Sequence, residues 1–262
     1  MNINLVRSAL FFGCLILLVS ATALAQSDEA NFTLSTGVGF TSGTYGGDED
    51  IEDLYVPVTG SVDLGKVAFR LTVPYLSVRA PEGTVIGPDG QPVPGSGDMN
   101  TESGLGDVIA GVTVFDVIKS RRLGFVMDLT GKIKFGTADV DKGLGTGEND
   151  YSLQAEFYKF AGQFTWMGSV GYKLRGAPAD VELNDVLLAS IGGTYRVSPE
   201  TGFGLSFDYR ESAIPDYASI QELTGFVSRR IGDSWRIHMY AFTGFSDSSP
   251  DLGIGFSVNR AL

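Results

Sequence analysis

The sequence has 262 residues, of which 43% are hydrophobic and only 19% are charged, and it contains 35 glycines. Its formal net charge of −12 argues against nucleic acid as a partner, because an acidic chain repels phosphate groups. One cysteine and one histidine exclude an internal disulfide framework and a cluster of cysteine or histidine ligands for a transition metal. We therefore expect no metal centre and no cofactor.

Residues 1–25 have the pattern of a secretory signal peptide. Arg7 supplies the positive charge, an apolar run follows, and a small-residue cleavage pattern ends at Ala25. The alternative, a lipoprotein signal ending at Cys14, fits less well because bulky aromatic residues precede the cysteine. We expect an exported protein whose mature chain comprises residues 26–262.

Hydrophobic residues alternate with polar ones along the whole mature chain, with the period of two that is typical of a β-strand with one apolar face. In residues 123–135, for example, large apolar residues take every second position, and most of the residues between them are polar. Such runs predict twelve strands, near residues 31–42, 53–64, 66–78, 106–117, 123–136, 151–160, 164–175, 185–197, 201–211, 219–231, 234–245 and 252–260.

The connections between these segments alternate in length. Short ones, such as Gly65 and residues 161–163, alternate with longer polar ones, such as residues 43–52 and 137–150. This alternation is typical of up-and-down outer-membrane barrels, whose short turns lie in the periplasm. A secreted β-sandwich is the alternative, but soluble strands average about 5–6 residues and most of these are longer. We predict an all-β fold, a single up-and-down transmembrane β-barrel of about 12 antiparallel strands, in the outer membrane of a Gram-negative bacterium.

The connection of residues 79–105 is much longer than the others. Its prolines and glycines argue against both helix and regular sheet. A segment of this length is expected to be functional or disordered. Folding into the barrel as a constriction and extending outside the cell are both compatible with the sequence.

Twelve strands enclose a lumen narrower than that of barrels with 16–18 strands. On the polar side of the predicted strands, which faces this lumen, basic residues outnumber acidic ones by nine to four. Rings of lysine and arginine favour anions, although pairing of charges between neighbouring strands would explain the same residues. The predicted lumen-facing binding residues are Arg70, Asp128, Lys132, Lys134, Lys173, Arg175, Arg196, Asp208, Arg210 and Arg236, and the remaining members of the count are Arg230, Glu156 and Glu222.

We expect no enzyme and no catalytic residues. His238 has Arg236 and Tyr240, and no serine, at the alternate positions of its strand, so the sequence predicts an ordinary lumen histidine rather than a hydrolase base. The acidic runs within residues 48–53 and 139–150 lack the ligand spacing of an EF-hand. They are expected to be solvated loops.

Two short motifs resemble a known outer-membrane family. Residues 72–76 (TVPYL) precede the long connection, and residues 103–108 (SGLGDV) end it. Both are similar to segments of the meta-pathway phenol-degradation-like transporters. The resemblance implies a barrel for uptake of small, often aromatic or hydrophobic compounds, and it implies no catalysis.

The expected function is therefore an outer-membrane channel for passive uptake of small solutes, with aromatic or hydrophobic compounds as the class that the resemblance implies. Two alternatives stay open: a basic-lumen channel for anionic oligosaccharides or acids, and a non-conducting structural or adhesion barrel. The expected partners are outer-membrane lipid, small-molecule solutes and, during biogenesis, the barrel assembly machinery. Phe256 in the last alternating segment is the candidate assembly signal.

Overall fold

The computed structural model describes residues 30–86, 91–178 and 182–262, so the predicted signal peptide at residues 1–25 lies outside the described part. Within these ranges, no helix is long and apolar enough to cross a membrane. The strands are β1 (Asn31–Gly43), β2 (Ile51–Asp63), β3 (Val67–Pro81), β4 (Val85–Ile86), β5 (Pro92–Val93), β6 (Met99–Leu105), β7 (Val108–Ser120), β8 (Phe125–Phe135), β9 (Asp150–Ala161), β10 (Phe164–Leu174), β11 (Val186–Arg196), β12 (Thr201–Arg210), β13 (Ile220–Ile231), β14 (Trp235–Gly244) and β15 (Leu252–Ala261).

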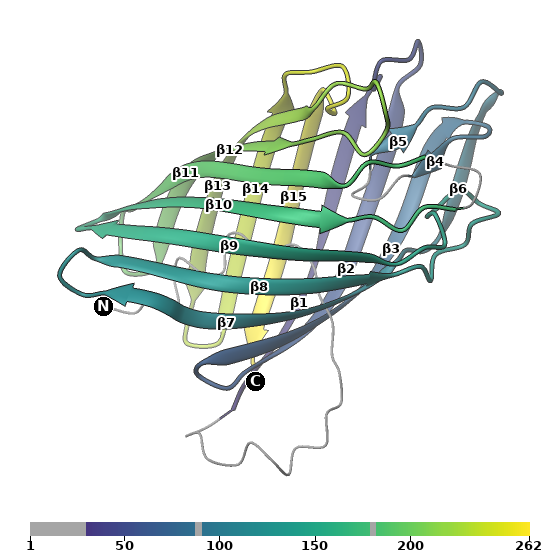
Figure 1. Ribbon diagram of the computed structural model, residues 1–262. Helices are drawn as coiled ribbons and strands as arrows, with labels where there is room; N and C mark the ends of the chain where they lie inside the picture. Colours follow the sequence, from purple (N-terminus) through teal and green to yellow (C-terminus); the bar gives the residue numbers. More distant parts are fainter. Residues whose placement is uncertain (1–29, 87–90, 179–181) are drawn as a thin grey trace.

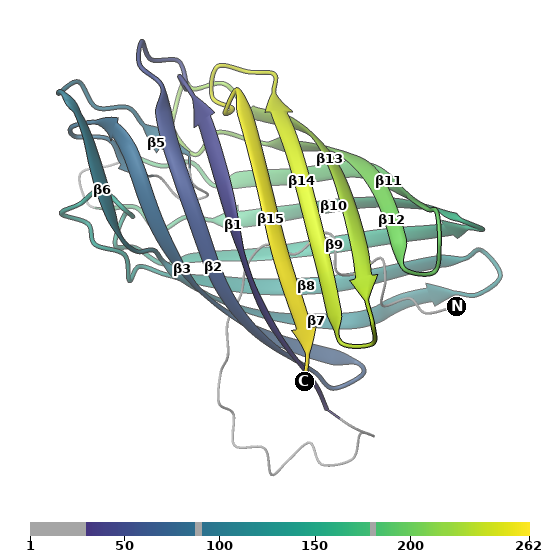
Figure 2. The same ribbon diagram turned by 180° about the vertical axis from the view of Figure 1, so that it is seen from behind.

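These strands form a closed antiparallel barrel with twelve strand positions. β4 and β5 form a separate two-stranded sheet. Consecutive long strands pair with each other, and β1 pairs with β15, so the sheet closes on itself. β6 and β7 together occupy one strand position of the barrel, because β6 pairs with the second half of β3 and β7 pairs with the first half. Figures 1 and 2 show the wall of β7 to β12 facing the wall of β13 to β15 and β1 to β3. The predicted 12-stranded up-and-down barrel is confirmed.

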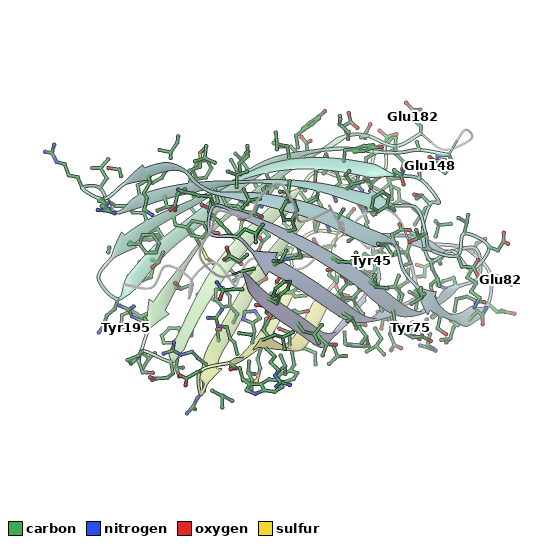
Figure 3. The ribbon with its side chains drawn as sticks, turned by 90° about the horizontal axis from the view of Figure 1, so that it is seen from below. Tyr45, Tyr75, Glu82, Glu148, Glu182 and Tyr195 are labelled. Atoms are coloured by element: carbon green, nitrogen blue, oxygen red, sulfur yellow. The ribbon has the colours of Figure 1, made fainter. Side chains whose placement is uncertain are left out.

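Short turns and long loops lie at opposite ends of the barrel. β9 and β10 are joined by the two residues 162–163, whereas residues 136–149 join β8 to β9. In Figure 3, Glu82, Glu148 and Glu182 mark the long-loop end, and Tyr195 marks the short-turn end. These two names are used below.

The outer wall of the barrel is apolar. Leu153, Ile191 and Leu205 point outward and each has more than half of its surface exposed. A barrel carries such a band where lipid tails cover it, because in water this apolar area would be unfavourable. Exposed aromatic residues lie near both ends of the outer wall: Trp166, Tyr195, Phe203 and Trp235 near the short turns, and Tyr75, Tyr172 and Phe245 near the long loops.

The expectation that residues 79–105 contain no regular sheet is wrong. β3 continues to Pro81, and β6 pairs with it from Tyr75 opposite Leu105 to Pro81 opposite Met99. Pro81 is the last residue of β3 and Pro92 the first of β5, and at a strand end a missing N–H disrupts no central ladder. Between β3 and β6, the hairpin of β4 and β5 turns inward, and Ile86 donates its backbone N–H to Gly143 O at 2.7 Å. Part of this connection therefore extends the wall, and the described residues Ile86 and Gln91 of the hairpin line the cavity inside the barrel.

The weak alternation of residues 106–117 also has a structural cause. The register between β7 and β8 shifts between Val114 and Ile118, which marks a β-bulge. Within it, Asp116 has a φ of 54°, and its N–H donates to Asp128 Oδ1 at 2.7 Å. The bulge changes the phase of the side chains, so the alternation of the sequence is interrupted there.

Candidate functional site

The lumen holds two cavities, one toward each end. The long-loop cavity has a volume of about 520 Å³ and the short-turn cavity about 380 Å³. Among the described residues, none lines both cavities. Volumes of this order suit small molecules rather than polymers in compact form.

A layer of buried apolar side chains lies between the two cavities. This mid-barrel cluster joins side chains of β8, β9 and β10 to one of β13. On β14, Tyr240 lines the long-loop cavity and Arg236 the short-turn cavity, so the cluster occupies the level between them. Its members are Val126, Tyr158, Met167 and Phe226, with Phe160 and Tyr240 packed against them. A solute that crosses the barrel has to pass this layer.

The ten residues predicted to face the lumen are distributed over both cavities and the wall between them. Lys132, Lys134, Lys173 and Arg210 line the long-loop cavity, and Arg70 and Arg236 line the short-turn cavity. Asp128 is buried beside the β7 bulge, and Asp208 accepts a hydrogen bond from Ser206 Oγ at 2.9 Å. Arg196 ends β11 in the same alternation as Leu188, which lines the long-loop cavity, and Arg175 directly follows β10.

The lining of the long-loop cavity is balanced in charge. Opposite the four cations stand four carboxylates, Asp53, Asp107, Asp150 and Glu222. The sequence had indicated only Glu222 of these as lumen-facing, because Asp53 and Asp150 had been assigned to the acidic loop runs. Asp150 precedes Ser152 and Gln154, which occupy the inward-facing alternate positions of β9. This alternation could have predicted that Asp150 faces the lumen. The excess of nine bases over four acids is therefore much smaller than expected.

An ion-pair network fixes the long-loop end of the wall. Lys134 Nζ lies 2.5 Å from Asp107 Oδ2 and 3.8 Å from Asp150 Oδ2. Arg175 donates to Asp150 Oδ2 at 3.2 Å, and the side chains of this second pair are only 1% and 2% exposed. Burial lowers the pKa of Arg175 to about 10, and the charge of Asp150 opposes this shift. At neutral pH the guanidinium stays protonated, so the pair is ionic.

Inward-folded loops cover the long-loop cavity with apolar side chains. We call these apolar side chains the roof cluster. Residues of β2, β3, β4 and two connections contribute to it: Tyr45, Ile51, Leu76, Val78, Ala80, Ile86, Ala138 and Leu144. Burial, together with the charges of Asp53 and Glu222, raises the pKa of Tyr45 to about 12, although a hydrogen bond with Thr41 opposes the shift. The Tyr45 hydroxyl is therefore neutral and available as a donor or acceptor at the cavity surface.

A row of rings follows the inner face of β14, and the alternation of the sequence had not indicated it. The ring centroids of Phe226 and His238 are 5.5 Å apart, those of His238 and Tyr240 6.0 Å, and those of Tyr240 and Phe242 6.4 Å. His238, Tyr240 and Phe242 stand at every second position of one strand, and this spacing could have predicted that their rings share one face. Phe226 joins them because β13 pairs with β14.

His238 lies inside this row. The register places Ser228 and Ser257 directly opposite it on the two neighbouring strands, which the sequence analysis of its own strand did not consider. Within the described residues, His238 Nδ1 is buried without a hydrogen-bond partner. Neither serine is therefore hydrogen-bonded to Nδ1 of His238.

Comparison with solved structures identifies barrels of the same fold. The porin NanC aligns with a TM-score of 0.58 and 10% identity, over 87% of this chain and 100% of NanC. The porin KdgM aligns with a TM-score of 0.54 and 7% identity, over 88% of this chain and 99% of KdgM. At these identities the likeness shows the fold alone.

Among curated proteins, no sequence matches this chain. A family model, however, matches nearly the whole of it. The model is that of the family described as "Putative MetA-pathway of phenol degradation", and the match covers residues 21–258. The chain belongs to this family.

Proposed function

We propose that the protein is an outer-membrane channel of a Gram-negative bacterium, exported by the signal peptide at residues 1–25, through which small solutes diffuse passively. The observation that carries this proposal is the pair of cavities enclosed by a lipid-covered barrel. The partners are outer-membrane lipid, the solute and, during biogenesis, the barrel assembly machinery.

Aromatic or hydrophobic compounds are the proposed solutes. The long-loop cavity presents Tyr45, Tyr55, Tyr240 and Phe242 beside aliphatic side chains, and such a lining suits apolar rings. The description of the family, which refers to phenol degradation, supports the same class. Neither cavity carries the large excess of positive charge that would attract anions strongly.

A channel for anionic oligosaccharides or acids is the second candidate. Lys173 and Arg210 both line the long-loop cavity, and Arg175 follows Lys173 by two residues, so three basic side chains gather in one part of the wall. KdgM, one of the structurally similar porins, has been solved in complex with oligogalacturonate. The four carboxylates of the long-loop cavity count against this alternative.

Planar-bilayer recording tests the proposal. The purified barrel, checked for folding by its shifted gel migration before heating, is expected to give discrete current steps and a small preference between K⁺ and Cl⁻. A strong preference for Cl⁻ would favour the anion channel. A folded barrel that gives no current and releases no small solute from liposomes would contradict both channels and favour the structural or adhesion role.

A further inference from the structure

Two rings of the row on β14 lie flat against the barrel wall. A Cβ added at Gly255 would lie 2.2 Å from Cζ of Tyr240, and one added at Gly253 would lie 2.1 Å from Cε1 of Phe242. These two glycines of β15 therefore provide the space in which the rings rest. The planes of the two rings differ by 12°. Because one face of each ring covers a glycine, the other face is turned to the long-loop cavity, which both residues line.

The flat surface extends toward β1. The hydroxyl oxygen of Tyr240 would be 2.8 Å from a Cβ at Gly39, so this ring spans β15 and reaches the next strand. Gly39 stands opposite Tyr55 of β2, which lines the same cavity. We call the rings of Tyr240 and Phe242, with the glycines beneath them, the aromatic floor.

A carboxylate with an unused oxygen stands at the edge of this floor. Phe242, Gly253, Thr41 and Asp53 lie opposite one another on β14, β15, β1 and β2. Asp53 lines the long-loop cavity, and within the described residues its Oδ1 is buried with no hydrogen-bond partner. A buried polar atom without a partner is unfavourable, so a ligand that donates a hydrogen bond to it gains affinity.

We propose that the aromatic floor and Asp53 form a binding site for a small hydroxylated aromatic molecule such as phenol. The ring stacks on Tyr240 and Phe242, and the hydroxyl donates to Asp53 Oδ1. This inference rests on the proposed channel function and names the site at which the solute pauses.

The surroundings favour a neutral planar ring over a cation. Rings whose planes are nearly parallel present faces on which a planar ring can stack, whereas an ammonium group is best held by rings that surround it. The four cations of the cavity lining balance its four carboxylates, so the lining offers no net attraction to a cationic ligand. A hydroxyl gives the buried carboxylate its missing donor without bringing in another charge.

Calorimetric titration of the folded protein in detergent tests the site with three probes. Phenol has both the ring and the donor, cyclohexanol lacks the aromatic ring, and anisole lacks the donor. Phenol is expected to bind about two- to tenfold more tightly than cyclohexanol, from the ring contacts, and about tenfold more tightly than anisole, from the hydrogen bond. Choline is added as a cationic probe, and empty micelles correct for partition into detergent.

Variants separate the two contributions. Tyr240→Leu with Phe242→Leu keeps apolar volume and should bring the phenol-to-cyclohexanol ratio to about one. Asp53→Ala should do the same to the phenol-to-anisole ratio and leave the preference for phenol over cyclohexanol in place. Phe115→Leu is the matched control, because Phe115 is a lumen-facing ring of the short-turn cavity, and it should leave both ratios unchanged.

Equal affinities of the wild-type protein for the three probes, or tighter binding of choline, would overturn the site. The site would also be overturned if the phenol-to-cyclohexanol ratio persisted in the Tyr240→Leu and Phe242→Leu double variant, or if the phenol-to-anisole ratio persisted in Asp53→Ala. Current recordings of the same samples distinguish the two proposals. Phenol binding without conductance would contradict the channel and support the site. Conductance without selective binding of phenol would contradict the site and support the channel.

Discussion

Lys134 on β8 forms a 2.5 Å ion pair with Asp107, which lies in the gap between β6 and β7. The other oxygen of Asp107 accepts the backbone N–H groups of Thr137 at 3.0 Å and Ala138 at 2.9 Å. Asp107 belongs to the SGLGDV motif of residues 103–108. The motif thus ties the loop of residues 136–149 to the barrel wall, which gives one of the two family-like segments a structural role.

Replacement of Asp107 should loosen this loop. Asp107→Asn removes the ionic partner of Lys134 and weakens the acceptor for two N–H groups, so we expect a loss of about 1–3 kcal/mol in the free energy of unfolding. Urea unfolding followed by tryptophan fluorescence measures it. Glu102→Gln on β6 is the control, because it keeps an oxygen that accepts the hydrogen bond from Asn100 Nδ2, and it should change little. Equal stability of the two variants would contradict the anchoring role.

Removal of a roof side chain should open the long-loop cavity. Leu144→Ala leaves a hole in the roof cluster, where Leu144 is 2% exposed, and typical losses for such a change are about 2–5 kcal/mol. We also expect a higher single-channel conductance, because Leu144 lines the cavity and its truncation widens the path. Leu123→Ala, at an exposed turn position, should alter neither quantity. An unchanged conductance in Leu144→Ala would show that the roof does not restrict flow.

The barrel could be predicted because its main signal is local. Lipid on one side and a polar lumen on the other impose the alternation on each strand separately, and the predicted segment 164–175 differs from the observed β10, Phe164–Leu174, by one residue. The prediction failed where the pairing partner decides the structure. Met99–Leu105 is polar and glycine-containing, yet it forms β6 because β3 extends beside it. The bulge at Asp116 depends likewise on Asp128 of the next strand.

The candidate site was harder to predict for the same reason. The aromatic floor needs Tyr240 and Phe242 to stand opposite Gly255 and Gly253, and this register is a property of two strands. Asp53 ends the acidic run of residues 48–53 and begins the predicted segment 53–64, and the observed β2 starts two residues earlier, at Ile51, so that Asp53 lies within the strand. Alternation predicts which side of a strand a residue is on, but it does not predict which residues meet across the sheet.

Truncation of the mid-barrel cluster should increase conductance. Phe226 packs between the cavities, and a Cβ added at Gly204 of β12 would lie 2.5 Å from its Cζ, so its ring lies against the wall at this level. Phe226→Ala should raise the conductance, whereas Gly204→Ala should push the ring inward and lower it. Phe207→Ala, on the outer face of β12, should leave the conductance as in the wild type. A Gly204→Ala channel that conducts better than the wild type would contradict this view.

The buried pair of Arg175 and Asp150 leads to a prediction on stability and its pH dependence. Arg175→Gln leaves the Asp150 carboxylate with Lys134 at 3.8 Å as its remaining ionic partner. Breaking one side of a buried pair typically costs about 3–5 kcal/mol, and the double variant with Asp150→Asn should recover part of this loss.

The pKa of Arg175 is lowered to about 10 in the folded protein, below that of the unfolded chain. The unfolded state therefore binds more protons only above about pH 10, where stability rises with pH, and below that the contribution of Arg175 is constant. The difference in unfolding free energy between wild type and Arg175→Gln should accordingly be the same at about pH 7 and about pH 9, measured by urea titration. A difference that grows over this interval would show that the guanidinium is already losing its proton in the folded state and that the pair is not ionic.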